Sequence, residues 1–144
     1  MDRAEIPGER LPCPMTHELY RIDPGVYLVV MVGFYSFDDS QAINEVIFAQ
    51  DDPDGIHGRI YFAGVEYGGH EPDARDPRRT NSRCSAYAII TDRPSVRVSM
   101  LVVSKLMKLL GRELQAFREI PPAIVFMRGA VARARAKAQR PSAR

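Results

Sequence analysis

The stretch "YAIITDRPSVRVSMLVVSKLMKLL", residues 87–110, carries the two signals that decide the fold class. It opens with apolar and β-branched residues typical of a strand, and a short polar break then leads into a segment with helical periodicity. Pro94 suits the first turn of that helix, and Gly111 stands where glycine is favoured just past a helix end. A strand followed directly by a helix indicates an α/β domain.

The predicted helix is unusually apolar, with large aliphatic side chains over roughly 200° of its circumference against the ~100° of an ordinary surface helix. Its polar positions form one narrow arc that only Leu101 interrupts. A sheet covers one side of such a helix, so neighbouring helices, a second copy of the chain or an apolar ligand must cover the rest. The candidate self-association residues are Val98, Leu101, Val102 and Leu109.

Upstream of this stretch, the sequence predicts a hairpin, a helix and a parallel strand. Two extended runs, residues 17–22 and 26–34, are joined by Asp-Pro-Gly, which favours an antiparallel hairpin with a central second strand. Ser36 and Asp39 resemble a capping box, and we expect a helix from there to about residue 50. The strand predicted at residues 58–65 should run parallel to the second hairpin strand, because a helix separates them.

The remaining elements complete one small α/β domain. Residues 66–83 contain eight charged side chains and predict an irregular loop. A strand at 85–91, the helix described above, a short strand at 113–117 and a last helix from Pro121 follow. We therefore expect a mostly parallel sheet of four to five strands, with an N-terminal antiparallel hairpin strand and helices packed on it.

Composition places these elements in one domain of a soluble protein. The chain has 144 residues, 45% of them hydrophobic and 26% charged, which suffices for a single core. The expected division is a flexible N-terminal leader over 1–15, the domain over 16–130 and a basic tail over 131–144. No signal peptide or spanning segment is evident, and the two cysteines match no metal spacing, so we expect a cytoplasmic protein.

The element order, and the run "SAYAIITDRPSVRVSMLVVSKLM" above all, resembles the SpoIIAA-like or STAS/SEC14-type domains of bacteria. Members carry a strand ending in Asp or Ser, a Ser-Pro-type corner, a Val- and Arg-bearing helix and a short strand with Arg and Phe, as "AFRE" here. The resemblance covers about residues 17–130. It implies a regulatory module that works through protein contacts, or a carrier of a small apolar or lipid-like ligand.

The same family includes members with a phosphorylation switch, but this sequence departs from their pattern. In the anti-anti-sigma branch of the superfamily, a serine or threonine at a helix start after the third strand is phosphorylated. The matching positions here read "YGGHE", residues 67–71, without a hydroxyl at the helix start, and Thr80 and Ser82 come later, beyond two arginines. The crossover helix that members place between the third and fourth strands is also missing from the pattern.

Besides the apolar helix, two segments are candidate sites. The corner Asp92, Arg93 and Ser95 precedes a helix, where backbone N–H groups favour anions, but it lacks the glycines of a phosphate cradle, and Asp92 reads better as a helix cap. The glycine-bearing segment lies at the favourable carboxyl end of a parallel strand, so it is the candidate partner- or ligand-binding loop. Its residues are Tyr67, Gly68, Gly69, His70 and Glu71.

Catalysis and metal binding have weaker support in the sequence. His70 with Glu66 or Glu71 could serve an enzyme, but no helical or paired-cysteine framework for a metal accompanies them. The last 17 residues hold six basic side chains and no acidic one, which predicts at most weak, salt-sensitive nucleic-acid binding. We therefore expect a non-catalytic, self-associating interaction module without cofactor or metal, whose partner is a protein or a second copy of the chain.

Overall fold

The fold is built around β3 (Val26–Val30), whose five residues are all buried, as its unbroken apolar sequence predicts. In the computed structural model, which describes residues 3–71 and 84–140, β3 pairs antiparallel with β2 (Glu18–Asp23) and parallel with β5 (His57–Phe62). Gly25 turns the chain between β2 and β3 at φ +88°, a conformation that favours glycine. The predicted hairpin and its parallel neighbour are confirmed.

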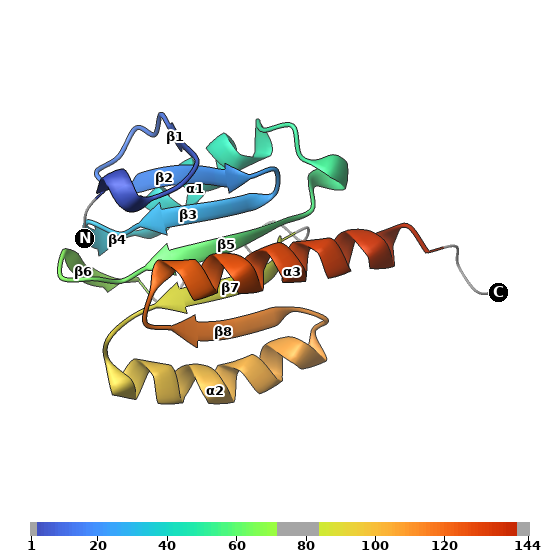
Figure 1. The fold of residues 1–144 in the computed structure, drawn as a ribbon. Helices are drawn as coiled ribbons and strands as arrows, with labels where there is room; N and C mark the ends of the chain where they lie inside the picture. Colours follow the sequence, from blue (N-terminus) through green and yellow to red (C-terminus); the bar gives the residue numbers. More distant parts are fainter. Residues whose placement is uncertain (1–2, 72–83, 141–144) are drawn as a thin grey trace.

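The main sheet has six strands in the order β1-β2-β3-β5-β7-β8 (Figure 1). β7 (Cys84–Ile90) extends β5 in parallel, and β8 (Glu113–Phe117) extends β7 in parallel. The predicted α/β class, with a mostly parallel sheet and an antiparallel N-terminal part, is therefore confirmed.

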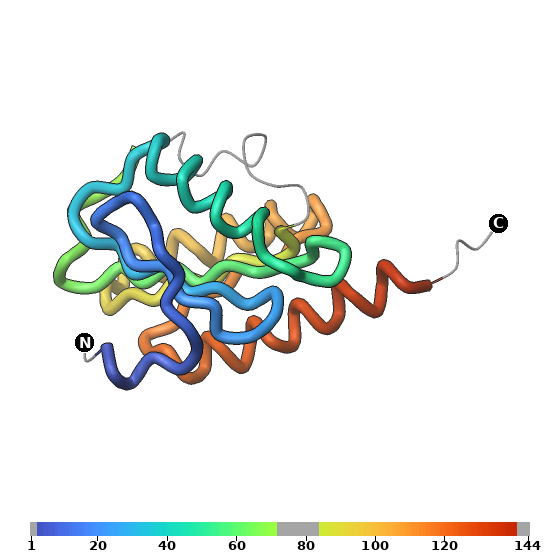
Figure 2. The backbone as a smooth tube through the Cα atoms, turned by 90° about the horizontal axis from the view of Figure 1, so that it is seen from above, coloured from blue at the N-terminus to red at the C-terminus, as the bar shows by residue number. Residues whose placement is uncertain are grey.

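Helices cover both faces of this sheet, and Figure 2 shows α1 and α3 on opposite sides of it. α1 (Phe37–Phe48) begins with the predicted capping box, since Ser36 Oγ accepts a hydrogen bond from the Asp39 N–H and Asp39 Oδ2 accepts one from the Ser36 N–H. α3 (Ile120–Ala138) lies against the other face through five buried side chains. These are Ala123, Ile124, Met127, Ala130 and Val131.

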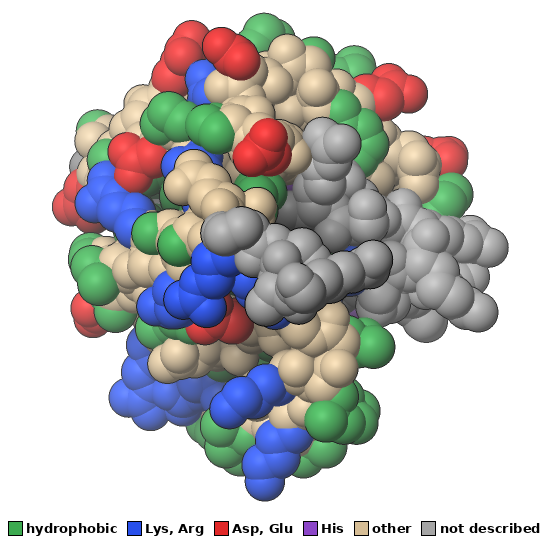
Figure 3. All heavy atoms as spheres, turned by 90° about the vertical axis from the view of Figure 1, so that its right-hand side faces the viewer, with side chains coloured by type: hydrophobic (Ala, Val, Ile, Leu, Met, Phe, Trp, Pro, Cys, Tyr) green, Lys and Arg blue, Asp and Glu red, His purple; other side chains and the backbone are tan. Residues whose placement is uncertain are grey.

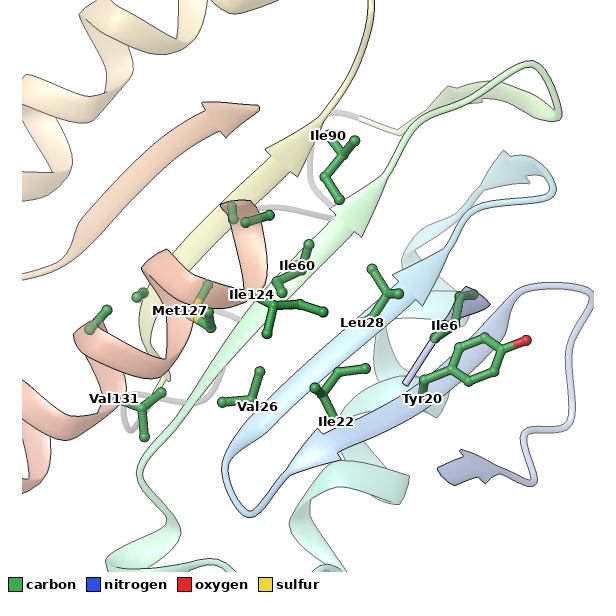
Figure 4. Close-up of a cluster of buried hydrophobic side chains, with 14 of the residues drawn as sticks. Ile6, Tyr20, Ile22, Val26, Leu28, Ile60, Ile90, Ile124, Met127 and Val131 are labelled. Carbon is green, nitrogen blue, oxygen red and sulfur yellow. The ribbon is translucent and has the colours of Figure 1, made fainter. Parts of the chain in front are cut away.

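The two faces carry separate hydrophobic clusters. Under α3, the side chains converge from β2, β3, β5 and β7, as Figure 4 shows for Ile22, Leu28, Ile60 and Ile90. Under α1, Ile43 and Ile47 pack on the opposite side chains of β2, β3 and β5. This alternation along β3 follows from the two-residue period of a strand.

The N-terminal segment differs from the flexible leader expected over residues 1–15. β1 (Glu9–Leu11) pairs antiparallel with β2, after a short 3₁₀ turn, η1 (Arg3–Glu5). Ile6 and Leu11 are buried, one in each hydrophobic cluster. Three prolines hide any period in this stretch, so two anchoring side chains on opposite faces left no pattern to detect.

The C-terminal segment also differs from the expected basic tail over 131–144. α3 continues to Ala138, because Val131 is buried and two arginines have partners, one on β8 and one in the β2–β3 turn. Arg133 Nη2 lies 2.8 Å from Glu113 Oε1, and Arg135 Nη2 donates to the Pro24 carbonyl at 2.7 Å. Residues 141–144 lie outside the described part.

The predicted irregular loop over 66–83 begins with a strand instead. β6 (Tyr67–His70) pairs in parallel with β4 (Gly33–Tyr35), forming a second, two-stranded sheet. A 3₁₀ turn, η2 (Pro53–Gly55), links α1 to β5. Residues 72–83 lie outside the described part, and with them Thr80 and Ser82. Of the helices in the described ranges, none has the length and apolarity that a membrane crossing requires.

Candidate functional site

α2 (Pro94–Leu109) lies along β8 at the edge of the main sheet (Figure 1). It does not cover the centre of either face, and none of its side chains is buried. Val96, Met100 and Met107 are half-buried. α2 is thus the one long helix of the described residues without a core-facing stripe.

Six large aliphatic side chains of this segment are between 59% and 83% exposed. We call them the α2 apolar face: Val98, Leu101, Val102, Leu106, Leu109 and Leu110. Four of the six belong to the predicted self-association residues, so the structure leaves all of those on the surface. In Figure 3, hydrophobic and basic side chains stand side by side at the lower end of the molecule, where α2 lies.

Backbone contacts fix both ends of α2. At its start, Thr91 Oγ1 accepts a hydrogen bond from the Arg93 N–H at 3.2 Å, and Pro94 follows as the first helical residue. At its end, Gly111 adopts φ +73°, its N–H donates to the Lys108 carbonyl, and the next N–H donates to the Met107 carbonyl. These two bonds form a Schellman motif, which ends the helix sharply.

The predicted corner Asp92, Arg93 and Ser95 is entirely exposed. Arg93, not Asp92, is the N-cap residue, and it makes no side-chain capping bond, so the expectation that Asp92 caps the helix is wrong. The side-chain hydrogen bond at this corner comes from Thr91, which is buried and whose Oγ1 accepts from the Arg93 N–H. Asp92, Arg93 and Ser95 therefore do not form a binding site with any other side chain of the described residues.

α2 also carries serines and basic residues beside and between the side chains of its apolar face. Ser99 Oγ donates to the Ser95 carbonyl at 3.0 Å, and Ser104 Oγ donates to the Leu101 carbonyl at 2.7 Å, so both hydroxyls are satisfied within the helix. The charged residues of residues 94–109 are all basic, and they are Arg97, Lys105 and Lys108. Beside the face, a groove of about 540 Å³ runs between α2 and β8.

The candidate loop Tyr67, Gly68, Gly69, His70 and Glu71 forms strand β6 and its next residue. The Tyr67 hydroxyl contacts His70 Nδ1, and the two rings are stacked with centroids 6.0 Å apart. The Phe37 N–H at the start of α1 donates to Glu71 Oε2 at 3.2 Å. β6 belongs to the two-stranded sheet, whereas α2 packs along β8 of the six-stranded sheet (Figure 1). The candidate loop and the α2 apolar face are therefore two separate surfaces.

The carboxylates proposed to assist His70 have other partners. Arg3 Nη2 donates to Glu66 Oε1 at 2.6 Å, and Glu71 accepts from the backbone of α1. Within residues 3–71 and 84–140, no three His, Cys, Asp or Glu side chains lie close enough to hold a metal ion.

A buried polar group that the sequence did not predict lies under α1. Arg59, His57 and Asn44 are at most 3% exposed, and Arg59 donates a hydrogen bond to each of the other two. The alternation of β5 offers the only sequence signal, because His57, Arg59 and Tyr61 share one face of a strand that is otherwise apolar.

Comparisons with known proteins address the fold. By sequence, neither a protein-family model nor a curated protein matches the chain. Among solved structures, it is similar to an uncharacterised protein of the DUF3478 family with a SpoIIAA-like fold from Shewanella loihica. The two chains are 14% identical, the match covers 78% of this chain and 92% of that chain, and the TM-score is 0.57.

This likeness, together with the strand order and the helices on both faces, defines the class of the protein: it has a SpoIIAA-like α/β fold. The resemblance predicted from residues 17–130 is confirmed at the level of the fold.

Proposed function

We propose that this protein is a non-catalytic, STAS-like regulatory module of the bacterial cytoplasm that associates with a second copy of itself through the α2 apolar face. The observation that carries the proposal is the exposure of six Val and Leu side chains on one helix of a well-covered domain. Elsewhere in the described part of the chain, large aliphatic side chains are exposed singly, as Val125 is on α3.

The area of the face suits a dimer interface. A fully exposed aliphatic side chain presents on the order of 100 Å² to water, and burying it stabilises by about 25 cal/mol per Å². Six side chains exposed by 59% to 83% therefore present roughly 400 Å². This is close to the largest apolar patch expected on a monomer. That is about half of what each partner contributes to a standard interface of ~800 Å² per side. Neighbouring groove residues would supply the rest.

The cations of α2 predict how such a dimer responds to salt. In an antiparallel pair of helices related by a twofold axis, equivalent edges face each other, so Lys105 and Lys108 of one copy approach those of the other. Their aliphatic stems can cover apolar surface while the ammonium groups stay in water. Screening of this repulsion makes self-association tighter as ionic strength rises. An acidic partner would bind more weakly under the same change.

The test is the oligomeric state, measured by sedimentation velocity over a range of concentration and salt. We expect a dimer for the wild type, and monomers for Val102→Glu and Leu109→Glu. The matched control is Val125→Glu, which adds the same charge at an equally exposed apolar position of α3 and should leave the dimer intact. A monomeric wild type, or dimers in the two α2 variants, would contradict the proposal.

A second function, carriage of a small apolar ligand, is favoured by the groove between α2 and β8, which Val98, Leu101 and Leu114 line. Native mass spectrometry of gently purified protein separates the two. A ligand adds a few hundred daltons to each chain and is recovered by organic extraction, whereas a dimer of unmodified chains supports self-association alone.

A further inference from the structure

A second groove, of about 670 Å³, lies between the first turns of α3 and the N-terminal segment, and we call it the α3 groove. Two of its lining residues, Phe62 and Ile124, belong to the hydrophobic cluster under α3 or pack against it, so the groove adjoins that cluster. Figure 4 shows Ile124 of α3 and Ile6 of the N-terminal segment on either side of Leu28. Phe62 is the last residue of β5, and open α/β sheets bind ligands at the carboxyl ends of their strands.

The walls of the α3 groove are mostly apolar. They are formed by Pro7, Phe62, Ile120, Pro121, Ile124 and Val125. Val125 is 70% exposed, and Phe62 and Ile120 are half-buried, so apolar surface faces water here. A ligand with an apolar body gains free energy by covering such a surface.

The charged side chains of the α3 groove are Glu5, Glu119 and Arg128. Arg128 forms an ion pair with Asp23, so its charge is already balanced. Within the described residues, neither Glu5 nor Glu119 forms a hydrogen bond or an ion pair through its carboxylate. The groove therefore presents two carboxylates that no described residue neutralises.

The start of α3 does not make the groove a site for anions. A helix N-terminus attracts anions through its free N–H groups, but Pro121 and Pro122, the second and third residues of α3, have none. Glu119, the N-cap residue, places a negative charge at the same end of the helix. The charge of the groove is thus complementary to a cation.

We propose that the α3 groove binds a small organic cation, whose apolar body lies against Phe62, Ile120 and Val125 and whose protonated amine is attracted by Glu5 and Glu119. The apolar contact supplies most of the affinity. The two carboxylates are exposed, so each contributes modestly and together they select the sign of the ligand's charge. The site does not involve α2 and is independent of self-association.

The experiment uses hexylamine, hexanol and hexanoate, which share an apolar chain and are positive, neutral and negative at neutral pH. Each is titrated into isotope-labelled protein, and NMR follows the amide chemical shifts. We expect hexylamine to bind most tightly, hexanoate about tenfold more weakly and hexanol between them. The shift changes should concentrate at Phe62, Ile120 and Val125. Added sodium chloride should weaken the binding of hexylamine, because salt screens exposed charges.

Variants connect the preference for a cation to the two carboxylates. Glu5→Gln and Glu119→Gln should each weaken hexylamine binding about threefold, and the double variant should bind hexylamine and hexanol alike. Glu45→Gln removes an exposed carboxylate of α1, on the opposite face of the sheet, and should leave binding unchanged. The proposal is overturned if the wild type binds none of the compounds or all three equally, or if the double variant keeps its preference for the amine. Shift changes concentrated at Val98 and Leu101 would also overturn it, since they would place hexylamine beside α2.

Discussion

His17 on the loop before β2 and Asp39 in the first turn of α1 share a hydrogen bond of 2.9 Å, although they are 22 residues apart. The Val32 N–H donates to His17 Nδ1 at 2.9 Å, so Nε2 carries the proton that Asp39 Oδ2 accepts. The same carboxylate accepts the Ser36 N–H of the capping box. One side chain thus joins the start of α1 to the first hairpin strand.

Replacing Asp39 should therefore cost more than the loss of a helix cap. Asp39→Ala removes the capping-box bond, worth about 1 kcal/mol, and leaves the buried His17 N–H without its acceptor, which costs a further 1–3 kcal/mol or so. We expect urea denaturation to show a loss of about 2 kcal/mol or more in unfolding free energy. Asp38→Ala removes the neighbouring first-turn acid, which is exposed, and should cost less than about 1 kcal/mol. Equal losses in the two variants would refute the coupling.

Gly58 and Met127 determine how closely α3 approaches β5. A Cβ at Gly58 would lie 2.0 Å from Met127 Sδ, and Met127 is fully buried. Gly58→Ala should cost about 1–3 kcal/mol by overpacking, and Met127→Ala about 2–5 kcal/mol by leaving a cavity. In the double variant the new methyl group enters that cavity, so the two losses should sum to more than the measured total. A double-mutant cycle of unfolding free energies checks this, and strict additivity would contradict it.

Local patterns predicted the elements whose cause is local. The apolar run of β3, the capping box Ser36–Asp39 and the glycine after α2 each act within a few residues, and each is found where it was expected. β1 depends on pairing with β2 and on the burial of Ile6 and Leu11 in two different clusters. The last turns of α3 depend on partners far along the chain, such as the contact of Arg135 with the Pro24 carbonyl, 111 residues away. No periodic pattern reports such a contact.

The surfaces were predicted less completely than the elements. Periodicity showed that α2 has too many apolar positions for one covering sheet, but the side of the helix that β8 covers depends on the approach angle of that strand. The buried Arg59 was overlooked because an arginine in a strand reads as a solvent-facing position. Only its contacts with Asn44, from a different element, show that it points inward.

Two glycines, Gly111 after α2 and Gly129 inside α3, should respond in opposite ways to replacement by alanine. Gly111 adopts φ +73° and a Cβ there would meet nothing within 4 Å, so Gly111→Ala should destabilise through strain alone, by about 1 kcal/mol. Gly129 lies inside α3, where a Cβ would come within 3.1 Å of the flexible end of Arg133. Gly129→Ala should stabilise by up to about 1 kcal/mol. Thermal unfolding compares them, and a shift of the same sign in both would exclude this account.

His57 predicts a dependence of stability on pH. Its pKa is lowered from 6.5 to about 4 in the folded protein, by burial first and by Arg59 second. The unfolded chain therefore takes up the proton first, and stability falls as pH decreases from about 6.5 toward 4, by about 3 kcal/mol in all. Protonation would also turn the acceptor of the Arg59 N–H into a second cation.

The window between pH 6.5 and 5 isolates this effect, because the carboxyl groups whose pKa is lowered by their partners, Asp39 and Glu18, lose their contribution at more acidic pH. About 2 kcal/mol of the His57 effect should already be lost at pH 5. In His57→Gln, the amide oxygen can still accept from Arg59 but does not titrate, so unfolding free energies from urea titrations should stay nearly level across this window. A wild type as level as the variant would mean that His57 is not buried in its neutral form.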